Sequence, residues 1–254
     1  MNARIDFNCD LGEGCGDDAA IVPCISSASI ATGGHAGDEA SMRQAIALCL
    51  RHGTSIGAHP SFLDRAHFGR RELALTPAEI HTLVRSQVDA LAALCAPAGA
   101  TLAHVKPHGA LYNLAARDVQ VAEAVARAVR DCDPRLRLFA LAGSRLADAG
   151  RRLGLGVVEE VFAERAYAGD GSLVPRDRPG AVIEHLGDAL AQVRDMLRGG
   201  RVRAIDGSQV PVRADTLCLH GDRADAAMFA SALRDALRAE GVAILAPHAP
   251  EPAR

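Results

Sequence analysis

The chain has 254 residues, of which 49% are hydrophobic and 3% aromatic, and it carries 28 basic and 31 acidic side chains. This length and composition allow one large domain with a core of Ala, Val, Leu and Ile. The net charge of −3 argues against nucleic acid or an anionic membrane as the main partner, and no apolar run is long enough to span a membrane.

The N-terminus and the cysteines bear on where the protein works. The first six residues contain no signal-peptide core. The seven cysteines are odd in number, and none are spaced as Cys-x-x-Cys. We therefore expect a cytoplasmic protein with reduced, mostly buried thiols, without a structural disulfide and without zinc held by cysteine.

Short apolar segments alternate with helical patterns along the chain. Strands are predicted at 5–9, 29–31, 55–58, 102–105, 136–141, 157–161 and 216–219, and helices at 40–51, 77–95, 118–130, 145–152, 179–197 and 225–240. Residues 202–212 have the alternation of an exposed hairpin, and 242–245 is a candidate last strand. The pattern predicts one domain over 1–246, followed by a loose Pro-rich tail over 247–254.

This alternation implies parallel strands joined by right-handed crossovers, in either a barrel or a doubly wound sheet. Polar residues close nearly every predicted strand. They are Asp10 and Glu13, His35, His59, Lys106 and His108, Glu164 and Arg165, and His220 and Asp222. In an open sheet such residues would gather at the switch point, whereas in a closed barrel the ends of all strands converge. We therefore predict an α/β fold that closes into a barrel.

The densest polar cluster is the segment 104–113, His-Val-Lys-Pro-His-Gly-Ala-Leu-Tyr-Asn. A short buried strand ends there at Pro107 and Gly109. Lys106 lies in a segment suited to burial, and a buried ammonium needs an anion. That anion could be Asp10, Glu164, or a carboxylate or phosphoryl group of a substrate. Alternatively, Lys106 is scaffolding that pairs with a barrel carboxylate.

Other strand ends have more than one explanation. His35 follows two glycines, where a core histidine would have little to pack against. Asp38 is placed to cap the next helix, which accounts for it as well as a chemical role does. Glu164 could bind a ligand or pair with Arg165 or Arg176. The glycines at 12, 14 and 16 could direct backbone N–H groups at an anion or form a flexible loop.

Six motifs together resemble those of the LamB/YcsF family. They are Asn8-Cys-Asp10-Leu-Gly-Glu13, Gly34-His35-Ala-Gly-Asp38, Gly57-Ala-His59-Pro-Ser-Phe, the segment 104–113, Glu164-Arg-Ala-Tyr-Ala-Gly-Asp170-Gly-Ser-Leu-Val-Pro-Arg176 and Cys218-Leu-His220-Gly-Asp222. They cover nearly the whole chain in order. The chain departs from the family at Thr32-Gly33-Gly34-His35, where Cys-Gly-Phe-His is usual, so an aromatic is missing beside the candidate site.

The resemblance implies an irregular seven-stranded β/α barrel of the TIM-like kind, related to glycoside hydrolases and polysaccharide deacetylases. It also implies ATP-dependent opening of 5-oxo-L-proline to L-glutamate, with 5-oxoprolinase subunits B and C as partners. A lactam is an unreactive amide, and phosphorylation of its oxygen makes its carbon a better target for water. That chemistry needs cations near the phosphate, a base for the water, and Mg²⁺ carried by the nucleotide.

The candidate residues fit these roles. Lys106, Arg165 and Arg176 would stabilise phosphoryl charge, whereas His35, His59 or Asp10 would act as the base. A carboxylate such as Asp10 or Asp222 would hold the magnesium ion. We expect catalytic roles for Asp10, His35, His59, Lys106 and His108, and substrate or nucleotide binding by Asn8, Glu13, Asp38, Asn113, Glu164, Arg165, Asp170, Arg176, His220 and Asp222.

Two other functions are compatible with the same residues. Asp10, His35 and His59 at successive strand ends could hold one divalent metal ion, as in an amidohydrolase or deacetylase that acts without ATP. The chain could instead be a non-catalytic regulatory subunit whose partners carry out the chemistry. The density of ionisable groups at strand ends favours catalysis over this last function.

Overall fold

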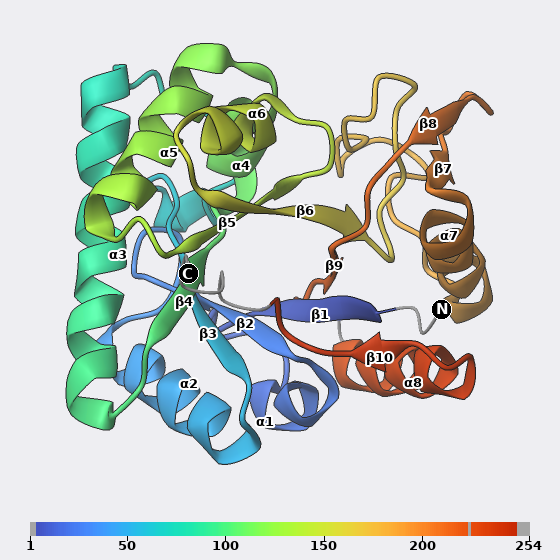
Figure 1. Ribbon diagram of the computed structural model, residues 1–254, viewed down its shortest axis with the longest axis horizontal. Coiled ribbons are helices and arrows are strands. Elements are labelled where there is room, and N and C mark those ends of the chain that lie inside the picture. Colours follow the sequence, from blue (N-terminus) through green and yellow to red (C-terminus); the bar gives the residue numbers. More distant parts are fainter. Residues whose placement is uncertain (1–3, 223–224, 248–254) are drawn as a thin grey trace, which may run out of the picture.

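Seven parallel strands close into a barrel in the computed structural model, which describes residues 4–222 and 225–247 (Figure 1). In order around the barrel they are β1 (Arg4–Leu11), β2 (Ser27–Ala31), β3 (Ser55–His59), β4 (Leu102–Val105), β5 (Arg137–Leu141), β6 (Gly156–Phe162) and β9 (Thr216–Leu219). Pairing of β9 with β1 closes the ring. The predicted closed α/β barrel is therefore confirmed.

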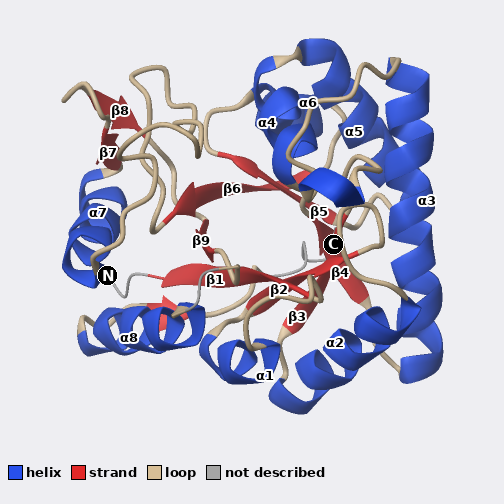
Figure 2. Ribbon diagram, turned by 180° about the vertical axis from the view of Figure 1, so that it is seen from behind, coloured by secondary structure: helices blue, strands red, loops and turns tan. Residues whose placement is uncertain are grey.

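Helices cover the outside of the barrel (Figure 2). They are α1 (Asp18–Ile21), α2 (Glu39–His52), α3 (Pro77–Cys95), α4 (Gly109–Arg117), α5 (Val119–Cys132), α6 (Arg145–Arg152), α7 (Leu186–Gly199) and α8 (Ala226–Ala239). Single 3-10 turns occur at Val22–Cys24, Arg65–His67 and Ala96–Ala98. None of the described helices is both long and apolar enough to cross a membrane.

Two small additions lie outside the ring. The antiparallel hairpin of β7 (Arg201–Arg203) and β8 (Gln209–Pro211) is the hairpin that the alternation predicts. The last strand, β10 (Ala243–Ile244), pairs in parallel with the start of β1. The predicted loose tail falls almost wholly on residues 248–254, which lie outside the described ranges.

Side-chain caps fix where the helices begin. Thr76 and Glu79 form a capping box at the start of α3, and Pro77 occupies the first turn. Asp38 and Ser41 form a second capping box at the start of α2, with Asp38 Oδ1 accepting from the Ser41 backbone N–H at 2.8 Å. Each cap satisfies N–H groups that have no partner within the helix. These caps place the helix starts within a residue of the positions expected from the sequence.

Helix α4 is not expected from the sequence, and helix α7 begins later than expected. Helix α4 begins at Gly109, whose positive φ of 55° suits a chain turn but does not prevent the helix that follows. Ala110, Leu111 and Tyr112 are buried on that helix, and this packing stabilises it. Conversely, α7 begins at Leu186 and not at 179, because Ala181 and Val182 run beside Arg165 in an extended bridge.

The barrel interior is partly polar. His104 on β4 stacks on Phe139 with ring centroids 4.1 Å apart, and a side chain at Gly57 would collide with its imidazole. His104 is almost fully buried in this stack and does not line the pocket described below. All seven cysteines are free thiols.

Candidate active site

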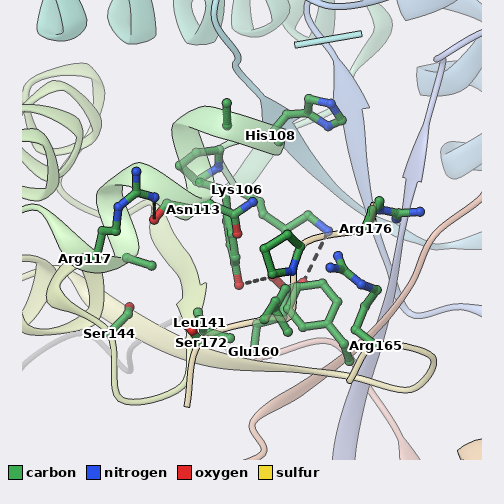
Figure 3. Close-up of a pocket in the computed structure, with 18 of the residues that line it drawn as sticks. Lys106, His108, Asn113, Arg117, Leu141, Ser144, Glu160, Arg165, Ser172 and Arg176 are labelled. Carbon is green, nitrogen blue, oxygen red and sulfur yellow. Dashed lines mark hydrogen bonds and ion pairs between the residues drawn. The ribbon is translucent and has the colours of Figure 1, made fainter. Parts of the chain in front are cut away.

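A pocket of about 980 Å³ opens at the carboxyl ends of the barrel strands, where β/α barrels bind their ligands (Figure 3). Its wall consists of residues at or just beyond the ends of β1, β3, β4, β5, β6 and β9, together with parts of α4 and the 170–177 loop. Nine of the side chains predicted from the sequence line it, namely Asp10, His59, Lys106, His108, Asn113, Arg165, Asp170, Arg176 and His220.

Lys106 lies at the base of the pocket and is the only lysine in the chain. Its Nζ is 2.5 Å from Asp10 Oδ1 and 3.2 Å from Glu160 Oε1. It also donates to Asn8 Oδ1 at 2.8 Å and contacts Cys218 Sγ at 3.4 Å. Although burial alone would lower the pKa of Lys106, the Asp10 carboxylate raises it well above its usual value. The side chain is therefore an ammonium at neutral pH.

Glu160 on β6 is the second anion at this base and is completely buried. Its Oε2 accepts a 2.7 Å hydrogen bond from the Tyr112 hydroxyl, and its Oε1 accepts one from Asn8 Nδ2 at 3.0 Å. Asn8 lies beneath the pocket without lining it, and it bonds to both Lys106 and Glu160. Asn8 therefore positions the charged groups rather than facing a ligand.

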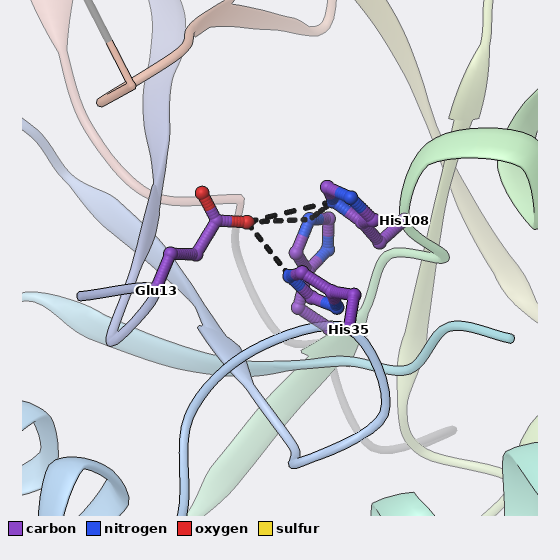
Figure 4. Close-up of side chains that lie close together, drawn as sticks. Glu13, His35 and His108 are labelled. Atoms are coloured by element: carbon purple, nitrogen blue, oxygen red, sulfur yellow. Dashed lines mark hydrogen bonds and ion pairs between the residues drawn. The ribbon is translucent and has the colours of Figure 1, made fainter. Parts of the chain in front are cut away.

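Three histidines and a glutamate form a cluster in the wall beside Asp10 (Figure 4). Glu13 Oε1 lies 2.8 Å from His35 Nε2, 3.5 Å from His108 Nδ1 and 4.0 Å from His59 Nε2. Burial raises the pKa of Glu13 to about 7, lowers that of His35 to about 4, and lowers that of His108 well below its usual value. His59 Nε2 is 3.3 Å from Asp10 Oδ2, which joins this cluster to Lys106.

Arginines border the same pocket. Arg165 is almost fully buried and donates to the backbone carbonyls of Val174, at 2.6 Å, and Ala181, at 3.4 Å. Within the described ranges it forms no ion pair with a carboxylate. Burial and the neighbouring Arg176 lower the pKa of Arg165 to about 10, so it stays charged at neutral pH. Its remaining N–H groups are available to an anion in the pocket.

Glu164 and Asp222 lie at a neighbouring, smaller cavity and have partners of their own. Glu164 pairs with His220 Nδ1. Lys106 and Arg165, which were both possible partners of Glu164 from the sequence, form no ion pair with it in the described part of the chain. Asp222 pairs with Arg70 and lies 3.7 Å from Arg176. The ion-pair partner of Glu164 is therefore His220, although Arg176 lines the same smaller cavity and helps to lower the pKa of Glu164.

Asp38 is a predicted site residue that lies away from both cavities. It is exposed and caps α2, so the structure favours capping for this side chain. Glu13 and His35 do not line the pocket themselves but contact His108, which does. Of the three histidines expected to converge on one pocket, His108 and His220 line it, and His35 stacks on His108 without lining it.

Several pocket residues were not predicted from the sequence. Glu160 is the main omission, together with Tyr112, Arg70, Arg117, Ser144 and Arg145. Glu159 and Glu160 are adjacent acids in an otherwise apolar strand. Because the side chains of a strand point alternately to its two faces, one of the two acids must point into the barrel. Arg70, Arg117 and Arg145 have no comparable signal, because surface arginines are common in any helix or loop.

A family model described as the LamB/YcsF family matches residues 5–251. The chain belongs to this family. Among curated proteins, the A subunit of 5-oxoprolinase from Bordetella pertussis is 51% identical over 251 residues, which is 97% of this chain and 100% of the relative. The same name and identity occur in Bordetella parapertussis, over the same shares of both chains.

Solved structures support the fold. A lactam utilization protein from Thermus thermophilus is 43% identical and has a TM-score of 0.90, covering 96% of this chain and 100% of its own. A putative cellobiose-phosphate cleavage protein from Enterococcus faecalis is 11% identical with a TM-score of 0.57, covering 96% and 97%. At that identity the second comparison shows the barrel fold alone.

The departure at Gly34 has a local explanation. A Cβ at this position would lie 2.4 Å from Ser61 Oγ and 2.7 Å from Gln87 Oε1. Gln87 in turn bonds to the Ser61 backbone and to Thr32. An aromatic residue at position 34 would therefore require this buried polar group to rearrange.

Proposed function

We propose that this chain is the A subunit of a 5-oxoprolinase, which opens 5-oxo-L-proline to L-glutamate with cleavage of ATP to ADP and phosphate. Its partners would be subunits B and C of the same enzyme. The names of the Bordetella relatives and of the Thermus structure support this function. The observation that carries it is the convergence of three cations, Lys106, Arg165 and Arg176, on one pocket.

Those cations suit a reaction in which negative charge develops on phosphoryl oxygens. Positively charged donors fixed in a partly dry pocket stabilise such charge because they need no reorganisation during the reaction. Lys106 is held by four contacts, and Arg165 by two backbone carbonyls. Both side chains are therefore preorganised before a ligand binds.

Two candidate bases for the attacking water lie next to Lys106. Asp10 and His59 both line the pocket, and their side chains lie 3.3 Å apart. His59 holds Asp10 in the ionised form together with Lys106, and these neighbours keep the pKa of Asp10 well below its usual value despite burial. Asp222 lines the neighbouring smaller cavity and pairs with Arg70 and Arg176, which both line the main pocket, and it is the carboxylate that would face a nucleotide-bound Mg²⁺.

Size is also compatible with two ligands. A cavity of about 980 Å³ is at the upper end of the range for small-molecule sites. It is much larger than a five-membered lactam needs. Arg117, Ser144 and Arg145 also line it, and Figure 3 shows Arg117 and Ser144 on the side away from Lys106. We propose that the lactam occupies the Lys106 end and that the phosphates of ATP extend toward the arginines.

The test is reconstitution of turnover. The chain is purified with and without subunits B and C, and glutamate and ADP are measured with 5-oxo-L-proline in the presence and absence of ATP. We expect glutamate and ADP in equal amounts only when all three subunits and ATP are present. ADP formation by B and C alone at the full rate would indicate a regulatory subunit. Glutamate formed by this chain without ATP would instead support a metal-dependent amidohydrolase.

A further inference from the structure

The cluster of Glu13, His35, His59 and His108 (the histidine cluster) draws one side chain from each of four successive strand ends. Glu13 follows β1, His35 follows β2, His59 ends β3 and His108 follows β4. Their side chains are between 0% and 7% exposed. Figure 4 shows the imidazoles directed at the Glu13 carboxylate from one side. The question is what lies between these atoms.

Backbone carbonyls determine which nitrogen carries the hydrogen in two of the rings. His59 Nδ1 lies 2.7 Å from the carbonyl oxygen of Lys106, and His108 Nε2 lies 2.9 Å from that of Phe68. A carbonyl oxygen only accepts, so both of these nitrogens donate. The other nitrogens, His59 Nε2 and His108 Nδ1, are therefore lone pairs in the neutral rings. They nevertheless face each other at 2.9 Å.

The third ring has the same arrangement. Ser61 Oγ donates its hydrogen to the carbonyl oxygen of Phe62 at 3.0 Å and lies 2.9 Å from His35 Nδ1. With that hydrogen on the bond to Phe62, His35 Nδ1 donates to Ser61 and the lone pair is on His35 Nε2, whereas a hydroxyl turned toward His35 Nδ1 would place the ring hydrogen on Nε2. That lone pair faces Glu13 Oε1 at 2.8 Å, and an ionised carboxylate oxygen is also only an acceptor. With the three rings neutral, Glu13 ionised and Ser61 bonded to Phe62, two pairs of electron-pair donors face each other with no donor hydrogen between them, so each of these two contacts needs a proton or a metal ion.

We propose that the histidine cluster is a binding site for one divalent first-row transition-metal ion of the zinc class. Three imidazole nitrogens and one carboxylate oxygen are a ligand set that such ions prefer over Mg²⁺. The outer nitrogen of each ring bonds to a carbonyl or hydroxyl oxygen, as metal-bound histidines do. Four of the six separations between the ligating atoms, 2.8, 2.9, 3.5 and 4.0 Å, bracket the roughly 3.4 Å edge of a tetrahedron built on bonds of about 2.1 Å.

Binding would require the rings to tilt. The His35 and His108 rings stack in parallel with centroids 3.6 Å apart, and their lone pairs lie in the ring planes, so both rings would have to turn for these lone pairs to point at one ion. A second group, Asp10, Cys218 and His220, also has metal-ligating atoms close together. There, however, the Lys106 ammonium already contacts both Asp10 and Cys218. The histidine cluster contains no lysine or arginine that fills its centre in this way.

The ion would give the pocket a Lewis acid. His59 and His108 line the pocket, so an ion held by them would border the same space as Lys106. His59 would then have no lone pair to offer, and Asp10 would be the remaining base at this wall. The site itself does not depend on the proposed function, since the contacts that define it lie within this chain.

The experiment uses the untagged full-length chain, stripped with chelator and then dialysed against one equivalent of Zn²⁺. We expect one zinc ion per chain by elemental analysis, no retention of Mg²⁺, and visible absorption bands with Co²⁺ that lack sulfur charge transfer. Glu13→Gln and His108→Gln should lose most of this affinity, and Ser61→Ala should weaken it about 10–100-fold. His81→Gln, a partly exposed histidine on α3 that pairs with Asp131, should bind normally.

Circular dichroism and thermal unfolding would show whether each variant is folded. A folded wild-type chain that retains no zinc would overturn the proposal. It would mean that protons, and not a metal ion, lie between His59 and His108 and between His35 and Glu13. A sulfur-to-cobalt charge-transfer band would also overturn it, because such a band would place the ion at the second group, which contains Cys218. Because the readout is binding by the chain alone, a failure to turn over 5-oxo-L-proline with subunits B and C would not affect it.

Discussion

Lys106 Nζ lies 2.5 Å from Asp10 Oδ1, although the two residues are on strands β4 and β1 and almost a hundred positions apart in sequence. Both side chains are at most 4% exposed. A buried ion pair is costly to desolvate, and removal of one partner strongly destabilises the protein because the other charge stays buried without compensation. Lys106 compensates two carboxylates at once, because Glu160 is 3.2 Å away. Its role in structure and its role in chemistry must therefore be separated by experiment.

Lys106→Met should destabilise the chain by about 3–5 kcal/mol, because it leaves Asp10 and Glu160 buried without the ammonium. The single variant therefore does not distinguish scaffolding from catalysis. Lys106→Met combined with Glu160→Gln removes one of the two anions and should recover part of the loss in urea unfolding. If Lys106 stabilises phosphoryl charge, turnover with subunits B and C should stay on the order of a hundredfold low in the double variant. Recovery of turnover together with stability would make Lys106 scaffolding.

The fold could be predicted because its signal is local. Each barrel strand is a short apolar run followed by a helix, and the caps at Asp38 and Thr76 mark the helix starts. Helix α4 was not predicted, because Pro107 and Gly109 indicate a turn and nothing local shows that Leu111 and Tyr112 would be buried. Tertiary packing decides such cases.

The site could be predicted only as a set of candidates. From their positions at the ends of strands we predicted that four residues share one pocket, and they do: Asp10, His59, Lys106 and His108. Pairing could not be predicted, since Asp10, Lys106 and Glu160 are on three different strands and no spacing rule relates them. For Glu160, the sequence shows two adjacent acids on β6 but not which one points inward. The structure shows that Glu159 instead pairs with Arg151 and bonds to the Gly143 N–H.

Gly57→Ala should destabilise the barrel by roughly 1–3 kcal/mol. A Cβ there would lie 2.1 Å from His104 Nε2, and the ring cannot withdraw easily because it stacks on Phe139. Gly187→Ala is the matched control, because no atom lies within 4 Å of its Cβ position and it lies inside α7. The control should be neutral or slightly stabilising. Thermal unfolding of both variants measures the difference, and equal melting temperatures would contradict the close approach of His104 to β3.

The stability of the chain should depend on pH through Asp6. Its carboxyl group accepts hydrogen bonds from Ser26, Ser27 and Thr216, and burial raises its pKa from 3.8 to about 6. Between these two values the folded state binds a proton that the unfolded state lacks, so the free energy of unfolding falls as the pH rises.

Asp6→Asn cannot ionise, which isolates this contribution from those of other carboxylates. Relative to the wild type, the Asn variant should gain roughly 3 kcal/mol between about pH 4 and pH 7, from two pKa units at about 1.4 kcal/mol each. Urea unfolding at several pH values gives the difference directly. A difference between the two proteins that does not change with pH would mean that Asp6 is already ionised at low pH in the folded state.

Arg165 offers the sharpest test of the proposed chemistry. It is a buried guanidinium that lines the pocket, bonds to two backbone carbonyls, and has no carboxylate partner within the described ranges. A buried cation without an anion is unfavourable unless a ligand supplies the charge. Substrate carboxylate or phosphoryl oxygen would complete its hydrogen bonds, so binding and turnover should depend on it.

Arg165→Gln should lower kcat/KM for 5-oxo-L-proline on the order of a hundredfold in the three-subunit enzyme. Arg178→Gln is the matched control, since Arg178 is exposed in the same loop and does not line the pocket. Because Arg165 also holds the carbonyls of Val174 and Ala181, thermal unfolding must accompany the kinetics. A folded variant with a lowered melting temperature and near-normal turnover would make Arg165 an anchor for the 166–182 loop. A selective rise in KM for one substrate would instead show whether its guanidinium faces the lactam or the nucleotide.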